Sequence, residues 1–405
     1  MTSSAGKFKR IPLWEAFGSQ DMHVFGGFNI FDSLINKKEW FVLTLEEPYF
    51  LYKRPENDPK IMDIFSEFTD AEINRLRLNP TTFFMFNYMW EGSSYEDYNY
   101  FELLTVSALR KGIPLEKIFF VSSNLKDEIV YNHWQRQHYP RDRINVINFN
   151  YFAEYMGRHL YEGVTIDQTV ANIKEDQKFF LSLNRRVRPY RAYTVYKLFA
   201  SHIKKNTMMS YDRISFDDVA AINFRYKTID PEIFKKLVES APSVLDFHDF
   251  SKNWACEPCE AARPTGLFEK SLISLVSETL FETNGKSSLF YSEKTFKPIL
   301  YNHPIVIFGQ PGLNTTLSTV GFKCYNNYFD LSFDYIEDHV VRLDAQLKQL
   351  EILNDKLESM TIKQRVDWLL QDRETLEYNK NALVKQVYNK KKLNELIEIV
   401  KNQCE

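Results

Sequence analysis

An unusual density of arginine marks residues 179–199, which read FFLSLNRRVRPYRAYTVYKLF. A predicted strand ends at Leu183, and Pro189 stands where the first residue of a helix is favoured. The loop between them carries one amide and three guanidinium side chains, those of Asn184, Arg185, Arg186 and Arg188. Helix N–H groups and arginine side chains both bind phosphate oxygens, so this loop predicts an anion site at the carboxyl end of a strand. A solvated basic loop is the alternative that the residues alone leave open.

A second group of charged residues lies in residues 271–312, which read SLISLVSETLFETNGKSSLFYSEKTFKPILYNHPIVIFGQPG. Glu278 comes just after one predicted strand, and Glu293 and Lys294 come at the start of a predicted helix. A second strand, 304–308, runs into a turn rich in glycine and proline. A carboxylate accepts hydrogen bonds from a ribose diol, and a lysine at a helix start neutralises a diphosphate. Together with the arginine loop, these residues favour a nucleotide as the anion.

The two segments resemble the donor-binding half of the alpha-1,3-fucosyltransferase family and of related phage-encoded glycosyltransferases. In that family a strand ending in Ser-Asn precedes a helix that carries an arginine. A Phe-x-x-x-Glu-Asn strand, a Thr-Glu-Lys helix start and a Pro-Ile-x-x-x-Gly-x-Pro turn follow. The corresponding elements here read LSLNRRVRPYR, SLVSET, YSEKTFKPI and PIVIFGQPG, in the same order, and they lie in the second half of the chain. Ser292 stands where the family usually has threonine, a mild departure.

The resemblance implies an α/β enzyme of the GT-B fold, with two Rossmann-like domains facing a cleft. Its donor would be a nucleotide diphosphate sugar, UDP- or GDP-linked. Carried over residue by residue, the resemblance implies that Arg191 and Lys294 bind the diphosphate. It likewise assigns Glu293 to the ribose and Glu278 to the neighbourhood of the sugar. The full predicted donor-binding set is Asn184, Arg186, Arg191, Glu278, Glu293 and Lys294.

The metal chemistry of the other large glycosyltransferase fold is not expected. That fold uses an Asp-x-Asp site, and no two aspartates in this chain lie two residues apart. We therefore expect no metal, with arginine, lysine and helix dipoles stabilising the leaving diphosphate. The chain has one CxxC pair, Cys256 and Cys259, without a second pair at a zinc spacing, and we assign it a structural or incidental role.

An inverting transfer needs a general base on the acceptor side, at the end of a strand in the first half of the chain. Glu91 follows the apolar run TTFFMFNYMW and precedes Gly92, while Glu46 and Glu47 follow FVLTL and precede Pro48. The fucosyltransferase base lies shortly before a proline, which favours Glu47. The EGSSY turn leads into a predicted helix, which favours Glu91. We prefer Glu91 and keep Glu47 as the second candidate, since either residue could be a surface carboxylate.

These side chains require elements that bring strand ends together. Apolar runs rich in Phe, Tyr, Ile and Val alternate with segments of helical period, which is typical of parallel sheets with crossover helices. The predicted strands are 40–45, 82–90, 117–122, 143–148, 178–183, 272–276 and 304–308, and the clearest predicted helices are 95–111, 189–201 and 293–301. The polar, acidic stretch 161–177 is predicted to be a linker.

At 405 residues the chain is long enough for two domains. We predict an acceptor-side Rossmann-like domain over residues 1–165 and a nucleotide-sugar-binding Rossmann-like domain over residues 166–340. Residues 341–405 are predicted to form C-terminal helices that pack on the domains. A helix seam supports this last prediction, and it is formed by Leu343, Leu347, Leu350 and Leu357.

Composition excludes several classes of protein. With 51 Lys and Arg against 54 Asp and Glu, the net charge of -3 argues against binding to a polyanion by bulk charge. Charged residues at 26% and apolar residues at 44% fit a folded globular protein better than a disordered chain or a membrane bundle. The first residues lack the apolar run of a signal peptide, and only four cysteines occur. We expect a cytoplasmic protein, in the host cytoplasm if viral, without a membrane partner.

Two basic stretches bear on the acceptor. They contain His133, Trp134, Arg136, His138, Arg141 and Arg143 in the first half, and Lys380, Lys385, Lys390, Lys391 and Lys392 near the C-terminus. Such a mixture can bind a nucleic acid backbone and stack on a flipped base, although solvated faces would have the same composition. The Phe, Tyr, Asn, Ile and Lys bias with few glycines resembles phage proteins from AT-rich genomes, whose glycosyltransferases often decorate hydroxymethylcytosine.

The favoured acceptor is therefore 5-hydroxymethylcytosine in double-stranded phage DNA, by resemblance and not by a motif. Two alternatives stay open. One keeps the enzyme and moves the acceptor to a glycan or a lipid-linked sugar. The other is a non-catalytic binding protein on a GT-B scaffold, against which the intact order of carboxylates and cations counts.

Overall fold

The computed structural model describes residues 8–11, 41–46, 63–65, 68–88, 92, 99–159, 164–184, 187–223, 229–243, 245, 266–281 and 288–404. The chain forms two compact units, and each unit takes up more than one stretch of sequence. Unit 1 comprises Met1–Tyr151, Asn284–Phe290 and Tyr388–Glu405. Unit 2 comprises Phe152–Thr283 and Tyr291–Val387.

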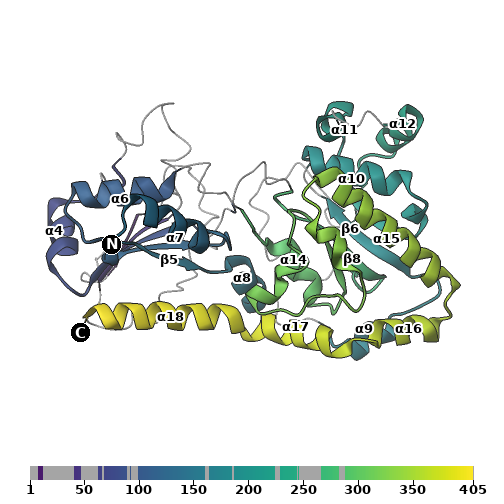
Figure 1. The fold of residues 1–405 in the computed structure, drawn as a ribbon. Coiled ribbons are helices and arrows are strands. Elements are labelled where there is room, and N and C mark those ends of the chain that lie inside the picture. Colours follow the sequence, from purple (N-terminus) through teal and green to yellow (C-terminus); the bar gives the residue numbers. More distant parts are fainter. Residues whose placement is uncertain are drawn as a thin grey trace, which may run out of the picture. The chain divides into compact units, whose positions relative to one another are not determined.

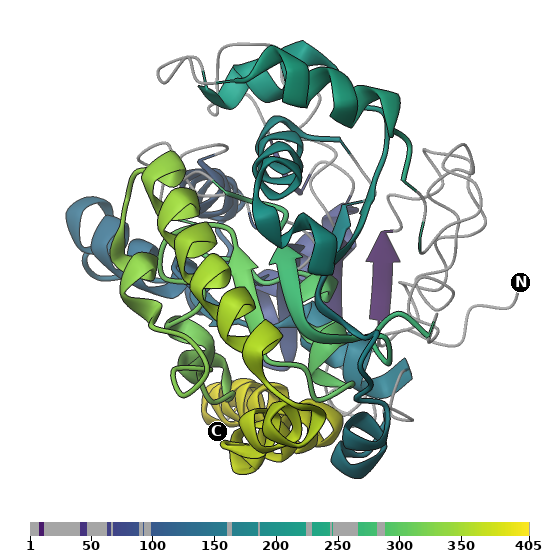
Figure 2. The same ribbon diagram turned by 90° about the vertical axis from the view of Figure 1, so that its right-hand side faces the viewer.

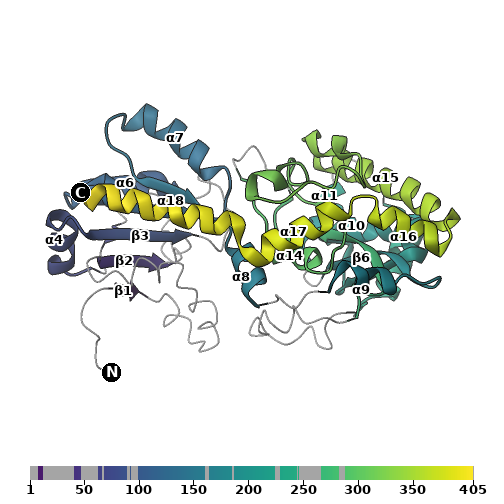
Figure 3. The same cartoon turned by 90° about the horizontal axis from the view of Figure 1, so that it is seen from below.

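Unit 1 is built on a parallel five-stranded sheet of order β1-β2-β3-β4-β5. Its strands are β1 (Phe8–Ile11), β2 (Phe41–Glu46), β3 (Thr82–Tyr88), β4 (Ile118–Ser122) and β5 (Asn145–Asn148). Figure 3 shows β1, β2 and β3 side by side. Every residue of β4 is buried, as expected for a parallel strand with both faces covered.

Among the described residues, four α-helices belong wholly or mostly to unit 1. They are α4 (Asp70–Leu78), α6 (Tyr100–Arg110), α7 (Asp127–His138) and most of α18 (Val387–Cys404). Two of them, α6 and α7, contribute aromatic side chains to its core. Tyr100 of α6 stacks on Phe120 of β4 with ring centroids 4.8 Å apart, and Phe101 meets the same ring edge-on. The high aromatic content of the sequence is thus used in part to fill this core.

Two distant stretches of sequence complete unit 1. The backbone N–H of Leu289 donates to Oδ1 of Asn124 at 2.9 Å, and the N–H of Leu125 donates to the carbonyl of Leu289 at 2.8 Å. In the C-terminal stretch, the Asn389 carboxamide donates to the carbonyl of Asn150 at 2.8 Å and accepts from its N–H at 3.1 Å. These contacts tie residues far apart in sequence into one unit.

Unit 2 is built on a parallel four-stranded sheet of order β7-β6-β8-β9. Its strands are β6 (Lys178–Asn184), β7 (Thr207–Tyr211), β8 (Ser271–Ser277) and β9 (Ile305–Phe308). Its α-helices are α8 (Tyr151–His159, from Phe152 onward), α9 (Ile166–Ala171), α10 (Pro189–Ala200), α11 (Phe216–Asn223), α12 (Pro231–Glu239), α14 (Glu293–Ile299), α15 (His339–Ser359), α16 (Ile362–Leu370) and α17 (Arg373–Lys385).

The strand order creates a switch point between β6 and β8. From β6 the chain passes through α10 to β7 on one side, and from β8 it passes through α14 to β9 on the other side. Because such crossovers are right-handed, the opposite directions place α10 and α14 on opposite faces of the sheet. In agreement, α10 packs against α15 and α14 packs against α17, and Figure 1 shows α10 above the strands and α17 below them. Ligands of open parallel sheets bind at the carboxyl ends of the strands at such a point.

The sequence predictions agree with most of these elements. All seven predicted strands are present, with ends that differ by a few residues where both ends are described, and the α/β class with parallel sheets is confirmed. The four seam leucines are buried in α15, which lies across one side of unit 2 in Figure 2. Within the described residues, no helix combines the length and the apolar character that crossing a membrane requires.

Candidate functional site

The site lies at the carboxyl ends of β6 and β8, where α10 and α14 begin. Pro189 opens α10 and needs no N–H partner there, so the chain turns into the helix directly after Arg188. Ser292 caps α14, and its hydroxyl accepts from the N–H of Lys294 at 3.4 Å. Two helix N-termini, each with partial positive charge, therefore flank the switch point.

The buried carboxylate of Glu278 holds the start of α14. One carboxylate oxygen accepts from the N–H of Ser292 at 3.0 Å and from the Thr295 hydroxyl at 2.5 Å. The other oxygen accepts from the Ser292 hydroxyl at 2.6 Å and from the N–H of Thr279 at 2.9 Å. With 0% exposure, Glu278 is occupied by its own chain, so its place next to the sugar stays a prediction.

Three side chains from the start of α10 hold the backbone that follows β8. Arg188 donates to the carbonyl of Thr279 at 3.1 Å, and Arg191 donates to the carbonyl of Glu278 at 3.3 Å. The Tyr190 hydroxyl contacts both carbonyls, and its ring stacks on Phe281 at 5.1 Å. Burial raises the pKa of Tyr190, against the effect of the two neighbouring arginine charges, so its hydroxyl stays a donor.

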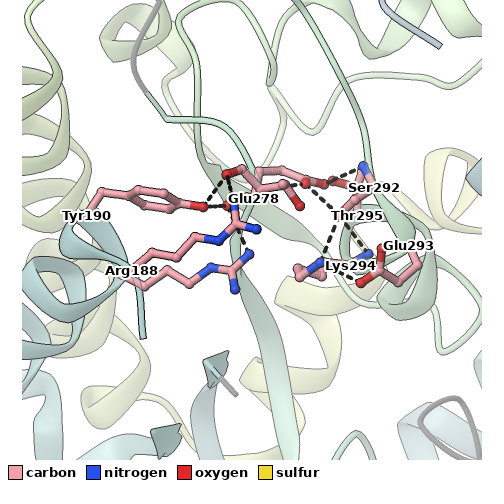
Figure 4. Close-up of polar contacts among 9 residues, drawn as sticks. Arg188, Tyr190, Glu278, Ser292, Glu293, Lys294 and Thr295 are labelled. Atoms are coloured by element: carbon pink, nitrogen blue, oxygen red, sulfur yellow. Dashed lines mark hydrogen bonds and ion pairs between the residues drawn. The ribbon is translucent and has the colours of Figure 1, made fainter. Parts of the chain in front are cut away.

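Lys294 and Glu293 form an ion pair on the first turn of α14. Their charged atoms are 2.5 Å apart, and both side chains are partly exposed. Partial burial opposes the charged form of Glu293, but the charge and hydrogen bond of Lys294, with Arg191 nearby, hold the pKa of Glu293 below its usual value. Figure 4 shows the Arg188 and Lys294 side chains on opposite sides of Glu278, with the Lys294 ammonium in contact with Glu293 and the Ser292 hydroxyl.

This arrangement can bind an anion that also carries hydroxyl groups. The Lys294 ammonium and the partly exposed Arg188 guanidinium supply charge, and the start of α10 adds N–H groups. Glu293 stays ionised at neutral pH, so its carboxylate can accept hydrogen bonds from hydroxyl groups. A phosphate ester of a diol has both features.

The structure brings most of the predicted donor residues together. Asn184 ends β6, and Arg191, Glu278, Glu293 and Lys294 lie at the same carboxyl edge of the sheet. Three predicted residues, Arg186 and the candidate bases Glu91 and Glu47, lie outside the described residues. Tyr190 and Thr295 were not predicted from the sequence, and Arg188 was predicted only as part of the basic loop.

A comparison of the two arginines refines the donor site. Arg191 is 5% exposed, because α10 turns it toward the sheet, while Arg188 is partly exposed at the helix start. Both arginines fall in one short segment, so spacing alone does not separate them. Arg188 is therefore the better-placed cation for a ligand.

Two further features concern metals and nucleic acid. In the part of the chain that the structure describes, no group of three or more His, Cys, Asp or Glu side chains could hold a metal ion. The CxxC pair lies outside that part.

On α7, Trp134 is 7% exposed and packs against Phe101 and Tyr131, so it belongs to the core and offers no face for base stacking.

No protein-family model and no curated protein matches this chain in sequence. Two solved structures are similar in shape over most of it. The alpha,alpha-trehalose 6-phosphate synthase of Burkholderia multivorans has a TM-score of 0.39 and 10% identity, covering 90% of this chain and 73% of its own. The alpha,alpha-trehalose-phosphate synthase (UDP-forming) of Burkholderia vietnamiensis has a TM-score of 0.40 and 10% identity, covering 95% of this chain and 81% of its own. Similarity at this level does not establish a shared fold, so the functional assignment rests on the site.

Proposed function

We propose that this protein is a glycosyltransferase of the GT-B type that uses a nucleotide diphosphate sugar, UDP- or GDP-linked, as donor. One observation carries the proposal. At the switch point of a parallel sheet, two helix N-termini, Arg188 and Lys294 surround a place that the ionised carboxylate of Glu293 also borders. A diphosphate needs the cations and N–H groups, and a ribose diol needs the carboxylate.

Each residue has a distinct role in this proposal. Lys294 and Arg188 bind the diphosphate and stabilise its growing charge as the sugar leaves, so no metal is required. Glu293 accepts hydrogen bonds from the ribose hydroxyls. Glu278 and Tyr190 position these groups through the contacts that hold α14 and the backbone after β8. Transfer with inversion uses a general base in unit 1, Glu91 or else Glu47.

The proposed acceptor is the hydroxymethyl group of 5-hydroxymethylcytosine in phage DNA. Exposed basic side chains on and after α7 support it, those of His133, Arg136, His138, Arg141 and Arg143. Their charge would contact phosphates, and binding would weaken steeply with salt. The C-terminal stretch offers less, because Lys380 donates to the carbonyl of Val164 and Lys392 pairs with Glu395.

The donor proposal is tested by thermal unfolding against UDP, GDP, ADP and CMP sugars. A ligand bound only by the folded protein raises the melting temperature by mass action. We expect one nucleotide class to stabilise the wild type but not Lys294→Ala. Lys297→Ala is the matched control, since Lys297 lies on the same helix against Phe268, which precedes β8. No stabilisation by any of the nucleotides would contradict the proposal.

The acceptor proposal needs a separate experiment. The enzyme is incubated with the sugar nucleotides and duplex DNA with or without hydroxymethylcytosine, and the nucleosides are analysed by mass spectrometry. Sugar on the modified DNA alone is the expected result. Sugar on a glycan acceptor and never on the DNA would reject the DNA acceptor and leave the donor assignment intact.

A further inference from the structure

Buried polar groups without partners gather at the carboxyl edge of the unit 2 sheet. Among the described residues of this edge, the atoms without a hydrogen-bond partner are Oδ1 of Asn184, Oγ of Ser277, both amide atoms of Gln310 and Nε of Arg191. The three neutral side chains, Asn184, Ser277 and Gln310, are 2%, 2% and 1% exposed. Buried polar atoms in native proteins are nearly always paired, so a group of unpaired ones calls for a ligand or ordered water.

The three residues lie at the carboxyl ends of three neighbouring strands. Asn184 is the last residue of β6 and Ser277 is the last residue of β8. Ser182 pairs with Leu275, so the same register continued by two residues sets Asn184 beside Ser277 on one face of the sheet. Phe308, the last residue of β9, pairs with Ser277, and Gln310 comes two residues later.

The turn that carries Gln310 is held firmly. Arg342 donates to the carbonyl of Gly309 at 2.8 and 3.2 Å, and the N–H of Gly312 donates to the carbonyl of Asp334 at 2.9 Å. A Cβ on Gly309 would lie 3.1 Å from Cβ of Glu278, so this turn approaches the residue that positions α14. A fixed frame around unpaired groups is what a preorganised subsite requires.

The chemistry of the three side chains differs from that of the diphosphate site. Two carboxamides and one hydroxyl are neutral, and each can both donate and accept hydrogen bonds. Phosphate oxygens only accept, whereas sugar hydroxyls do both. The charged groups stand at the helix starts, and the neutral groups stand at the strand ends beside them.

We infer that Asn184, Ser277 and Gln310 form a subsite for the hydroxyl groups of the transferred sugar, and that this sugar is neutral. The inference rests on the proposed function and specifies its donor. None of the three side chains supplies a charge to neutralise the carboxylate of a uronic acid, and Arg191, which has one unpaired N–H, is held at the start of α10 by the carbonyl of Glu278. A neutral hexose would therefore satisfy these groups, while an acidic sugar would bury an unpaired charge.

The test compares free nucleoside diphosphates with their sugars by isothermal titration. The ligands are UDP, UDP-glucose, UDP-galactose, UDP-N-acetylglucosamine and UDP-glucuronate, together with GDP, GDP-mannose, GDP-fucose and GDP-mannuronate. We expect at least one neutral sugar nucleotide to bind more tightly than its own diphosphate and than the matching acidic sugar. Ser277→Ala and Gln310→Leu should each weaken that neutral donor about tenfold and leave the free diphosphate unchanged.

Gln346→Leu is the matched control for burial. Gln346 is also 1% exposed with an unpaired oxygen, but it lies on α15 and donates to Ile307 in the middle of β9. This variant should leave both affinities unchanged. Equal weakening of free diphosphate and sugar nucleotide by the subsite variants would overturn the inference, as would tighter binding of the acidic sugar. Failure of the wild type to bind any of the diphosphates would instead count against the proposed function.

Discussion

Each unit contains a buried carboxylate near the end of a parallel strand, and the two carboxylates have different surroundings. In unit 1, Asp127 accepts from the Tyr100 hydroxyl at 2.6 Å, from the Asn124 carboxamide at 2.9 Å and from the Ser122 hydroxyl at 2.5 Å. In unit 2, Glu278 accepts from the N–H and hydroxyl groups of Ser292, from the Thr295 hydroxyl and from the N–H of Thr279. Both carboxylates are 0% exposed.

The difference lies in the groups around each carboxylate. Among its described contacts, Asp127 is bound directly by three neutral side chains. Around Glu278 stand a partly exposed lysine, a partly exposed arginine and neutral groups that no described residue satisfies. A buried carboxylate at a strand end is therefore a structural element in both units. The candidate site is distinguished by the polar groups that remain available to a ligand.

The largest expected effect comes from removing these carboxylates. Glu278→Ala should lower the free energy of unfolding by about 4 kcal/mol, because it leaves the start of α14 without its partners. Asp127→Ala should destabilise the protein by a comparable amount, measured by urea unfolding. With the milder changes Glu278→Gln and Asp127→Asn, only the first should weaken nucleotide binding. Equal loss of binding in both would erase the functional difference between the units.

A buried histidine in unit 2 should give the next largest effect. His303 is 0% exposed and contacts the Ser274 hydroxyl and the carbonyl of Phe268. Burial, partly offset by the Phe268 hydrogen bond, lowers the pKa of His303 to about 4. Below pH 6.5 the unfolded chain takes up a proton that the folded chain does not, so about 3 kcal/mol of stability is lost as the pH falls from 6.5 to 4.

Urea unfolding at pH 7 and pH 5 checks this expectation. His303→Gln should remove much of the difference between the two pH values. His133→Gln, at an exposed position in unit 1, should leave the difference unchanged and serves as the control. A pH dependence that persists in His303→Gln would show that other groups cause it.

Smaller effects are expected from replacing the two arginines at the start of α10. Arg188→Ala should cost about 2 kcal/mol of nucleoside diphosphate binding and little stability. Arg191→Ala should lower both the affinity for the nucleoside diphosphate and the free energy of unfolding, since its buried guanidinium also holds the Glu278 carbonyl. Lys126 is the N-cap residue of α7 in unit 1, where its side chain makes no capping hydrogen bond. Lys126→Ala is the matched control and should change neither the affinity nor the free energy of unfolding. Isothermal titration gives the affinity of each variant for the nucleoside diphosphate, and urea unfolding gives its free energy of unfolding.

The smallest expected effect is that of chelation. Because the cations and helix starts of unit 2 are proposed to stabilise the diphosphate, EDTA should change donor binding and transfer by less than about twofold. Complete loss of transfer on chelation, restored by manganese or magnesium, would mean that a metal ion replaces these side chains in the chemistry.

The sequence predicted the strands well for a physical reason. A parallel strand covered on both faces needs a continuous apolar run, and such runs are visible in the sequence of β4, β6 and β8. Strand β7 was not predicted, because its residues, TMMSY, include two polar side chains that interrupt the apolar run. α9 lies inside the predicted linker, where Thr165 and Gln168 form a capping box that marked its start.

The site was predicted in its location more than in its details. In the sequence, the arginine loop and the Glu293–Lys294 pair each follow a predicted strand, so their place at the carboxyl edge of a sheet could be inferred. That β6 and β8 lie next to each other is known only from their pairing in the structure. The direction of each side chain depends on contacts with distant residues, as when Glu278 turns toward Ser292 and Thr295. Trp134 shows the same limit, since its aromatic ring reads as a binding surface in sequence but fills the core.

The interleaved chain also restricts how the protein can be divided. A polypeptide ending at residue 151 would keep all five strands of the unit 1 sheet, but it would lack Leu289 and Asn389. Asn124 and Asn150 would then lose the hydrogen bonds that these residues provide. Unit 1 therefore cannot be produced as one continuous fragment with all its contacts, and a cut in the chain near residue 284 or 388 would release part of its packing. Any recombination of this protein with a relative has to exchange three segments together.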